Sequence, residues 1–196
     1  MSMKLMVLGL LMEKPRHPYD IRQTMKQRNW NNAFRLQDGS LYYAVDQLRE
    51  SGMIETIDAV PSEGEPRHDK TVYQITAEGK DELLALLYPQ LEKTAYPKHP
   101  MMMAMPFLRH ADPDKVIGIV ELQLEECRKR VERLEQVLAV KGTAIPRSSA
   151  RMIQGMIDFG RTEEKWLLDT LADAREGRFW EPSFEGGEHG WKGASE

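Results

Sequence analysis

The sequence lacks the features that mark secreted and membrane-spanning chains. Cys127 is the one cysteine among 196 residues, which excludes an intramolecular disulfide. No apolar run approaches the roughly 20 residues of a membrane-spanning helix. The apolar start at residues 5–12 is short, has no small-residue cleavage site and indicates a first core helix. We therefore expect a cytoplasmic chain with no membrane partner.

Catalytic and metal-binding signatures are also absent. The sequence has no glycine loop that cradles phosphates and no nucleophile elbow. Five histidines are scattered without the spacing of metal ligands: His17, His68, His99, His110 and His189. We therefore expect no enzyme activity, no catalytic residue, no metal and no cofactor.

The composition is that of a folded chain, but its charge is uneven. The net charge is −4, with 41% hydrophobic and 30% charged residues. Residues 1–50 nevertheless hold eight Lys and Arg against five Asp and Glu. Because phosphates sense only charges within about 8–10 Å at physiological salt, this basic front part is compatible with a nucleic-acid partner.

The front part predicts three short helices. Leu5, Leu8 and Leu11 recur at helical spacing before Pro15, and a second helix starts at "HPYDI", where Pro18 suits the first turn. Residues 28–36 indicate a turn region. A third helix follows from about residue 38 to residue 51, and Gly52 is well placed to end it.

A β-hairpin and a fourth helix come next. Residues 53–60 and 70–75 are β-prone and flank the polar loop "PSEGEPRHD". Thr76 suits the N-cap of a helix whose apolar face contains Leu83, Leu84 and Leu87 and which we expect to end at Pro89. The order is three helices, a hairpin and a helix.

The rear part predicts two long helices. Residues 89–111 hold four prolines and indicate an irregular connection. Asp112 and Pro113 begin a helix that nothing breaks before Gly142, and a second runs from about residue 148 to residue 176. The fold class is therefore mainly α with a small β-hairpin. The predicted divisions are a front domain, 1–88; a connection, 89–111; a helical domain, 112–177; and a flexible tail, 178–196.

Apolar residues of the first long helix are separated alternately by three and four positions. This spacing is typical of a packed helix seam. It indicates an antiparallel hairpin with the 148–176 helix, direct self-association, or both, and we expect a homodimer. The expected interface residues, with Cys127 as a small hydrophobe, are Ile117, Val120, Leu124, Cys127, Val131, Leu134, Leu138, Ile157, Leu167 and Leu171.

The polar side of the third helix suits DNA. Gln37, Ser40, Ala44 and Gln47 follow helical spacing, with Tyr43 beside them, and their amides and hydroxyl match base edges in a major groove. An ordinary solvated face is the alternative for a helix considered alone. Three helices followed by a hairpin, however, form a winged helix-turn-helix, whose third helix enters the groove. The expected phosphate contacts are Lys4, Arg35, Arg67, His68 and Lys70.

The chain resembles the PadR family of bacterial transcriptional regulators over about its first 88 residues. The residues that carry the resemblance are "LMVLGLL", "HPYDI", "GSLYYAVDQLRESGMIE" and "KTVYQITAEGKDELL". The resemblance implies that Ser40 and Tyr42 lie in the recognition helix, that a basic hairpin tip touches DNA and that the long rear helices form a dimer. The chain departs from the family in having Gln37 and Asp38 where Ser-Pro is common, and in a more acidic tip.

Two further expectations concern function. The resemblance favours a repressor of transcription that binds double-stranded DNA and is released by a small aromatic or drug-like effector. Tyr96, Phe107 and Trp166 are candidates to line an effector pocket, with core packing as the alternative. The competing function is a helical protein-interaction or adaptor module without sequence-specific DNA binding.

Overall fold

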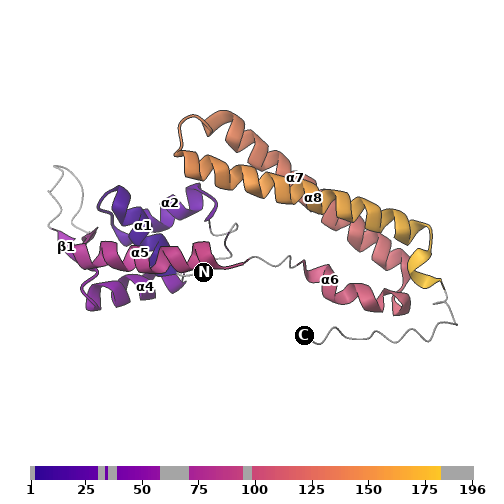
Figure 1. The fold of residues 1–196 in the computed structure, drawn as a ribbon, viewed down its shortest axis with the longest axis horizontal. Helices are drawn as coiled ribbons and strands as arrows, with labels where there is room; N and C mark the ends of the chain where they lie inside the picture. Colours follow the sequence, from indigo (N-terminus) through magenta and orange to yellow (C-terminus); the bar gives the residue numbers. More distant parts are fainter. Residues whose placement is uncertain (1–2, 31–33, 35–38, 58–70, 95–98, 182–196) are drawn as a thin grey trace. The chain divides into compact units, whose positions relative to one another are not determined.

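The chain forms two compact units. The computed structural model describes residues 3–30, 34, 39–57, 71–94 and 99–181. The first unit spans Met1–Tyr96 and the second spans Pro97–Glu196. Both are mainly helical, and the first carries a two-stranded hairpin, as the sequence predicted (Figure 1).

The three predicted front helices are confirmed. His17 accepts a hydrogen bond from the backbone of Tyr19 and so caps the second helix, and Pro18 stands at its first position. Gly52, two residues after the end of the third helix, adopts a left-handed conformation with φ of 71°, because a residue without a Cβ enters this region at little cost. The helices are α1 (Met3–Glu13), α2 (Pro18–Gln27) and α4 (Gly39–Glu50).

The segment between α2 and α4 corrects one expectation. Trp30 and Phe34 are helical, whereas the sequence predicted a turn throughout this stretch. Their rings meet edge to face, with centroids 6.3 Å apart, and the Arg28 guanidinium lies 5.2 Å from the centre of the Trp30 ring. Residues 31–33 and 35–38 lie outside the described part of the chain.

The predicted hairpin is also confirmed, in β1 (Ile54–Ile57) and β2 (Val72–Ile75). The strands are antiparallel, with Ile54 opposite Ile75 and Ile57 opposite Val72. Residues 58–70, which include the expected tip, lie outside the described residues.

The helix after the hairpin begins as predicted but ends later. The Thr76 hydroxyl accepts a hydrogen bond from the Gly79 backbone and caps α5 (Ala77–Glu92). Gly79 has no room for a side chain, since an added Cβ would collide with the Met53 carbonyl. The expected stop at Pro89 is wrong: α5 continues to Glu92, although this proline has no N–H for the carbonyl four residues before it. Leu84, expected on the apolar face, is exposed.

The core of the first unit lies where these elements meet. Side chains of α1, α2 and α4 fill it, together with one residue from each strand. Trp30, Met53, Ile75, Leu83 and Leu86 pack around the edge. The fully or almost fully buried residues include Val7, Leu8, Leu10, Ile21, Met25, Leu41, Val45, Leu48 and Ile54.

The connection at the front of the second unit is ordered, which corrects the irregular structure expected there. His99 caps α6 (Pro100–Ala104) by accepting a hydrogen bond from the Met101 backbone, and a 3-10 helix, η1 (Met105–His110), follows. Pro100 and Pro106 each stand at the first or second position of these helices. A proline there costs no hydrogen bond, because the first turn has no internal acceptor for its N–H.

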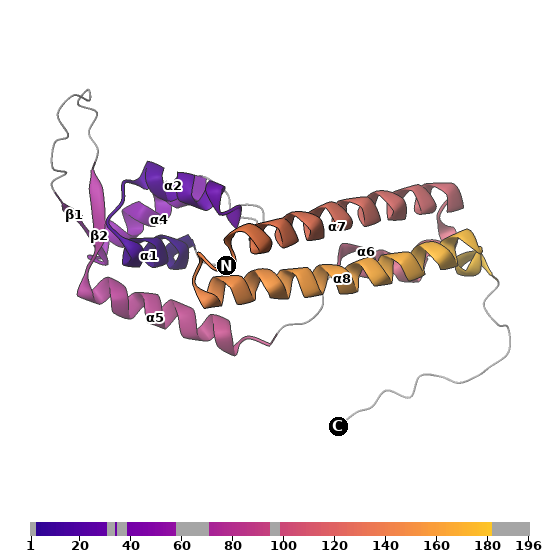
Figure 2. The same cartoon turned by 90° about the horizontal axis from the view of Figure 1, so that it is seen from above.

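Two long antiparallel helices form the main body of the second unit. Asp112 caps α7 (Pro113–Lys141) through the Lys115 backbone, as predicted, and α8 (Arg147–Arg175) returns along it. Figure 2 shows the pair side by side. Four ion pairs of 2.6 Å bridge the two helices and match the antiparallel register: Glu121–Arg175, Arg128–Glu164, Arg130–Glu163 and Glu135–Arg161.

The folded unit extends beyond the end of α8. Gly177 is left-handed, with φ of 77°, and begins a short 3-10 helix, η2 (Arg178–Trp180). Phe179 and Trp180 pack against the helical core, and the Trp180 indole donates to the Ala111 carbonyl at 2.8 Å. The sequence had placed these residues in a flexible tail. No helix of the described residues has both the length and the apolar character needed to cross a bilayer.

Candidate DNA-binding surface

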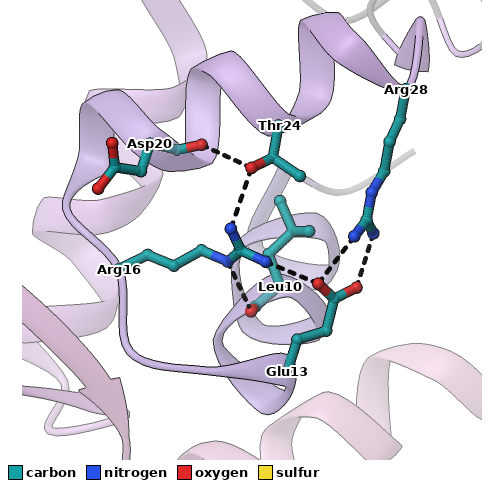
Figure 3. A network of polar contacts seen from close by, with 6 residues as sticks. All are labelled: Leu10, Glu13, Arg16, Asp20, Thr24 and Arg28. Carbon is teal, nitrogen blue, oxygen red and sulfur yellow. Dashed lines mark hydrogen bonds and ion pairs between the residues drawn. The ribbon is translucent and has the colours of Figure 1, made fainter.

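A network of charged side chains holds α1 against α2 (Figure 3). The Arg16 guanidinium donates to the Leu10 carbonyl at 3.2 Å, to the Thr24 hydroxyl at 3.0 Å and to the Glu13 carboxylate at 2.7 Å. Arg28, at the end of α2, donates to both oxygens of the same carboxylate at 2.6 and 2.8 Å. We call Glu13, Arg16, Thr24 and Arg28 the α1–α2 clamp.

The α1–α2 clamp gives two basic residues of the first unit, Arg16 and Arg28, a structural role. The pKa of Glu13 lies below its ordinary value, mainly because Arg28 donates hydrogen bonds to its carboxylate. The charge of Arg28 and the contacts of Arg16 lower this pKa further, and together they outweigh the opposite effect of partial burial. Sequence reasoning missed this network, although Glu13 and Arg16 stand three residues apart. The approach of Arg28 depends on how α2 folds back over α1.

The hairpin is joined to the helices through the backbone. Arg16 and Tyr73 exchange two hydrogen bonds of 3.0 Å, so the loop between α1 and α2 lies against β2 as a bridge. At the other end, the Thr76 hydroxyl donates to the Gly52 carbonyl at 2.8 Å. These bonds fix the hairpin relative to α1, α2 and the end of α4.

The exposed side of α4 is rotated from the predicted one. Leu41, Val45 and Leu48 are buried as expected, but Ala44, which the sequence placed on the polar side, is also buried. Ala44 packs into the core with the leucines because its methyl side chain fits between them. Tyr42 and Tyr43 are 47% and 68% exposed.

The remaining exposed positions complete this surface. Ser40 is exposed near the start of α4, and Gln47 is partly buried. Asp46, Arg49 and Glu50, which the sequence analysis did not single out, are exposed. We call the exposed side chains of Ser40, Tyr42, Tyr43, Asp46, Arg49 and Glu50 the α4 face.

Few of the predicted phosphate contacts fall within the described residues. Lys4 lies in α1 with a partly buried side chain. The others, and the predicted reader Gln37, lie outside the described part of the chain: Arg35, Arg67, His68 and Lys70.

The helix seam is formed inside one chain. Val120, Leu124, Cys127 and Val131 of α7 are buried in one core with Ile157, Leu167 and Leu171 of α8. The Cys127 thiol donates to the Gly160 carbonyl at 3.2 Å, and burial, the largest cause, raises its pKa. Of the predicted interface residues, Ile117, Leu134 and Leu138 remain partly exposed. The intramolecular packing of the two long helices, one of the arrangements that the sequence predicted, is therefore present in this chain.

The structure describes two of the three expected effector residues. Tyr96 lies outside the described residues, and Phe107 is 66% exposed. Trp166 packs against the helical core, and its ring meets the His99 ring edge to face at 4.9 Å. His99 Nε2 is in turn 3.4 Å from the Glu163 carboxylate.

The described residues show no metal site. Among them, no three His, Cys, Asp or Glu side chains come together in a way that would hold an ion.

Comparisons with known proteins identify a family model that matches the first unit. Residues 7–85 match the model of the transcriptional regulator PadR-like family. An uncharacterized protein of Lysinibacillus sphaericus is 33% identical over 81 residues, which are 41% of this chain and 71% of the relative.

Solved structures extend the likeness in fold to the rear helices. Bacillus subtilis PadR in complex with operator DNA has a TM-score of 0.73 and 18% identity, covering 87% of this chain and 98% of the other. The same protein in complex with p-coumaric acid has a TM-score of 0.67 and 18% identity, over 88% and 98%. The Vibrio cholerae virulence activator AphA has a TM-score of 0.71 and 15% identity, over 90% and 99%.

Proposed function

We propose that this chain, which belongs to the PadR-like family of transcriptional regulators, reads its operator with the α4 face inserted in the major groove. The observation that carries the proposal is the exposure of two adjacent aromatic side chains, Tyr42 and Tyr43, on a helix whose other side is locked in the core. Ser40 and Gln47 flank them and supply donors and acceptors, and we include Gln37 as a further reader.

The proposed reading of DNA also requires that α4 be held in a fixed position by the rest of the first unit. The α1–α2 clamp and the bonds from Arg16 to Tyr73 make α1, α2 and the hairpin one rigid support. A rigid support matters because hydrogen bonds between side chains and base edges tolerate little displacement of the recognition helix. Contacts to phosphates fix the position of the protein along the duplex. We propose Lys4, Arg35, Arg67, His68 and Lys70 as phosphate contacts, and we do not include Arg16 or Arg28, whose charges are engaged by Glu13.

The test uses two substitutions on the α4 face. Replacing Ser40 and Tyr43 together by alanine leaves the core residues of α4 in place, so the fold is retained while base contacts are lost. We expect affinity for the operator to fall at least tenfold, with little change for unrelated duplex DNA. Equal operator affinity of the double variant and the unchanged chain would refute the assignment of this face.

We further propose that the protein acts as a homodimer through its second unit. Several large apolar side chains stay exposed on the two long helices: Ile119, Leu122, Val137, Val140, Phe159 and Leu168. A second copy is the occupant that suits them, since a winged-helix dimer reads two half-sites about one helical turn apart. Ile117, Leu134 and Leu138 instead pack against the core between the two helices, and the rest of the seam supports the exposed surface from inside.

Phe159 offers a direct test of this interface. Its side chain is 78% exposed, so Phe159→Glu removes no core contact of the single chain. We expect the variant to sediment as a monomer at micromolar concentration. Thr143→Glu, in the exposed turn between α7 and α8, is the matched control and should remain dimeric. A dimeric Phe159→Glu variant would exclude Phe159 from the interface.

Regulation completes the proposal. A DNA-bound dimer excludes other proteins from its operator, and we propose that the chain represses transcription in this way. We also propose release by a small aromatic effector near Trp166, supported by the complex of Bacillus subtilis PadR with p-coumaric acid. Binding of a candidate effector near Trp166 should quench the tryptophan fluorescence of the unchanged chain, and this quenching should be absent in Trp166→Phe. A reporter gene behind the operator tests the direction of regulation.

A further inference from the structure

The outermost line of the α4 face is acidic. Tyr43, Asp46 and Glu50 follow one another at intervals of three and four residues, on the side of α4 opposite the buried leucines. The Asp46 side chain is 59% exposed. It lies in the second turn of the helix, and the first turns of a recognition helix are those that reach base edges.

A carboxylate at this position is unexpected in a DNA-binding surface. It repels phosphates and therefore lowers affinity for every sequence. In the described part of the chain, its one ionic partner is Arg49, whose guanidinium nitrogen is 3.7 Å away, too far for a hydrogen bond. The pair is exposed on both sides and weak, which leaves the carboxylate oxygens available to another donor.

The chemistry of base edges singles out one partner for such a group. An ionised carboxylate only accepts hydrogen bonds. In the major groove guanine presents two acceptors, thymine presents an acceptor and a methyl group, and adenine presents an acceptor beside its amino group. Cytosine alone presents its amino group without a neighbouring acceptor.

We infer that Asp46 determines specificity by accepting a hydrogen bond from the N4 amino group of a cytosine in each half-site. Arg49 lies beside it on the helix and is able to donate to O6 and N7 of a guanine in an adjacent pair. Each half-site then contains a cytosine opposite Asp46. The other three bases are disfavoured there because each would place a hydrogen-bond acceptor of its own next to the carboxylate. This inference rests on the proposed function of the α4 face.

The test is selection of DNA from a random duplex pool by the full-length chain, followed by titration of single-base variants of the selected site. Asp46→Asn has nearly the same shape but adds a donor, which suits the N6 and N7 edge of adenine. We expect the unchanged chain to prefer cytosine about tenfold at one position of each half-site, and Asp46→Asn to shift this preference to adenine.

Asp81→Asn is the control, because it makes the same change to an exposed carboxylate on α5, outside the α4 face. It should keep the preference for cytosine. An unaltered base preference in Asp46→Asn, or an equal gain in affinity for all sequences in both variants, would overturn the inference and leave the proposed function intact. A chain that selects no sequence at all would instead overturn the proposed function, and the inference with it.

Discussion

Removing the charge at the centre of the α1–α2 clamp gives a prediction that is separate from DNA binding. Glu13→Gln keeps the size of the side chain and one carbonyl acceptor but loses the negative charge. The carboxylate of Glu13 receives three hydrogen bonds, two from Arg28 and one from Arg16. We expect the variant to fold with a less stable pairing of α1 and α2.

The size of the effect follows from the exposure of the partners. The side chains of Glu13 and Arg28 are 41% and 39% exposed, so water screens their attraction and an isolated pair contributes less than about 1 kcal/mol. Arg16 is only 10% exposed, but it keeps its bonds to Leu10 and Thr24. The expected loss in the free energy of opening is therefore about 1 kcal/mol at pH 7.

The pH dependence has a definite sign. The pKa of Glu13 is lowered in the folded state, so its contribution is complete above the ordinary value of 4.5 and disappears as the pH falls through the folded value. Native-state hydrogen exchange of buried amides in α1 and α2 measures the opening free energy at each pH. The difference between the unchanged chain and Glu13→Gln should be constant near neutral pH and shrink under acid conditions.

A control and a contradictory result are available in the same experiment. Asp81→Asn removes an exposed carboxylate of α5 and should leave the exchange of α1 and α2 unaltered. If Glu13→Gln and the unchanged chain showed the same free energies at pH 7 and at pH 4, the clamp would have no role in stability.

Three further predictions concern packing. Gly160→Ala brings a methyl group to 2.5 Å from a methyl of Val131, and this clash should destabilise the helical pair by about 1–3 kcal/mol, partly offset by the higher helix propensity of alanine. Val131→Ala should relieve the clash. Urea unfolding of the double variant should therefore show a smaller loss of stability than the sum of the two single losses. Gly79→Ala would meet a backbone carbonyl and should lower the melting temperature, whereas Gly155→Ala has open space and should raise stability by about 0.5–1 kcal/mol. The buried Cys127 thiol, with its raised pKa, should resist alkylation at pH 7 until urea is added, as mass spectrometry would record.

The elements of the first unit were predictable because their signals are local. Pro18 at a helix start, Gly52 at a helix end and Thr76 at an N-cap each act through their own backbone, and all three are found in those roles. Prolines misled the prediction at Pro89 and Pro100. A proline disfavours a helix interior but suits the first turn, as at Pro100, and the sequence alone does not fix where a helix begins.

The candidate site was less predictable because it depends on tertiary contacts. The buried side of α4 was found from its leucines, but the small Ala44 fits either side of a helix, and only packing decides between them. The alternating three- and four-residue spacing of apolar residues between Asp112 and Gly142 likewise predicted a partner helix, but it did not say whether that helix belongs to the same chain or to a second copy. The clamp required Arg28 to meet Glu13 across 15 positions, a contact that no local pattern records.

The most direct test of the account is a binding titration of the purified chain on duplexes that it retains from its own genome. At physiological salt, with a scrambled duplex of equal length as the reference, we expect two chains per duplex and a preference of at least about a thousandfold for the retained sequence. Equal affinity for the two duplexes, or a complex with a single chain, would contradict it.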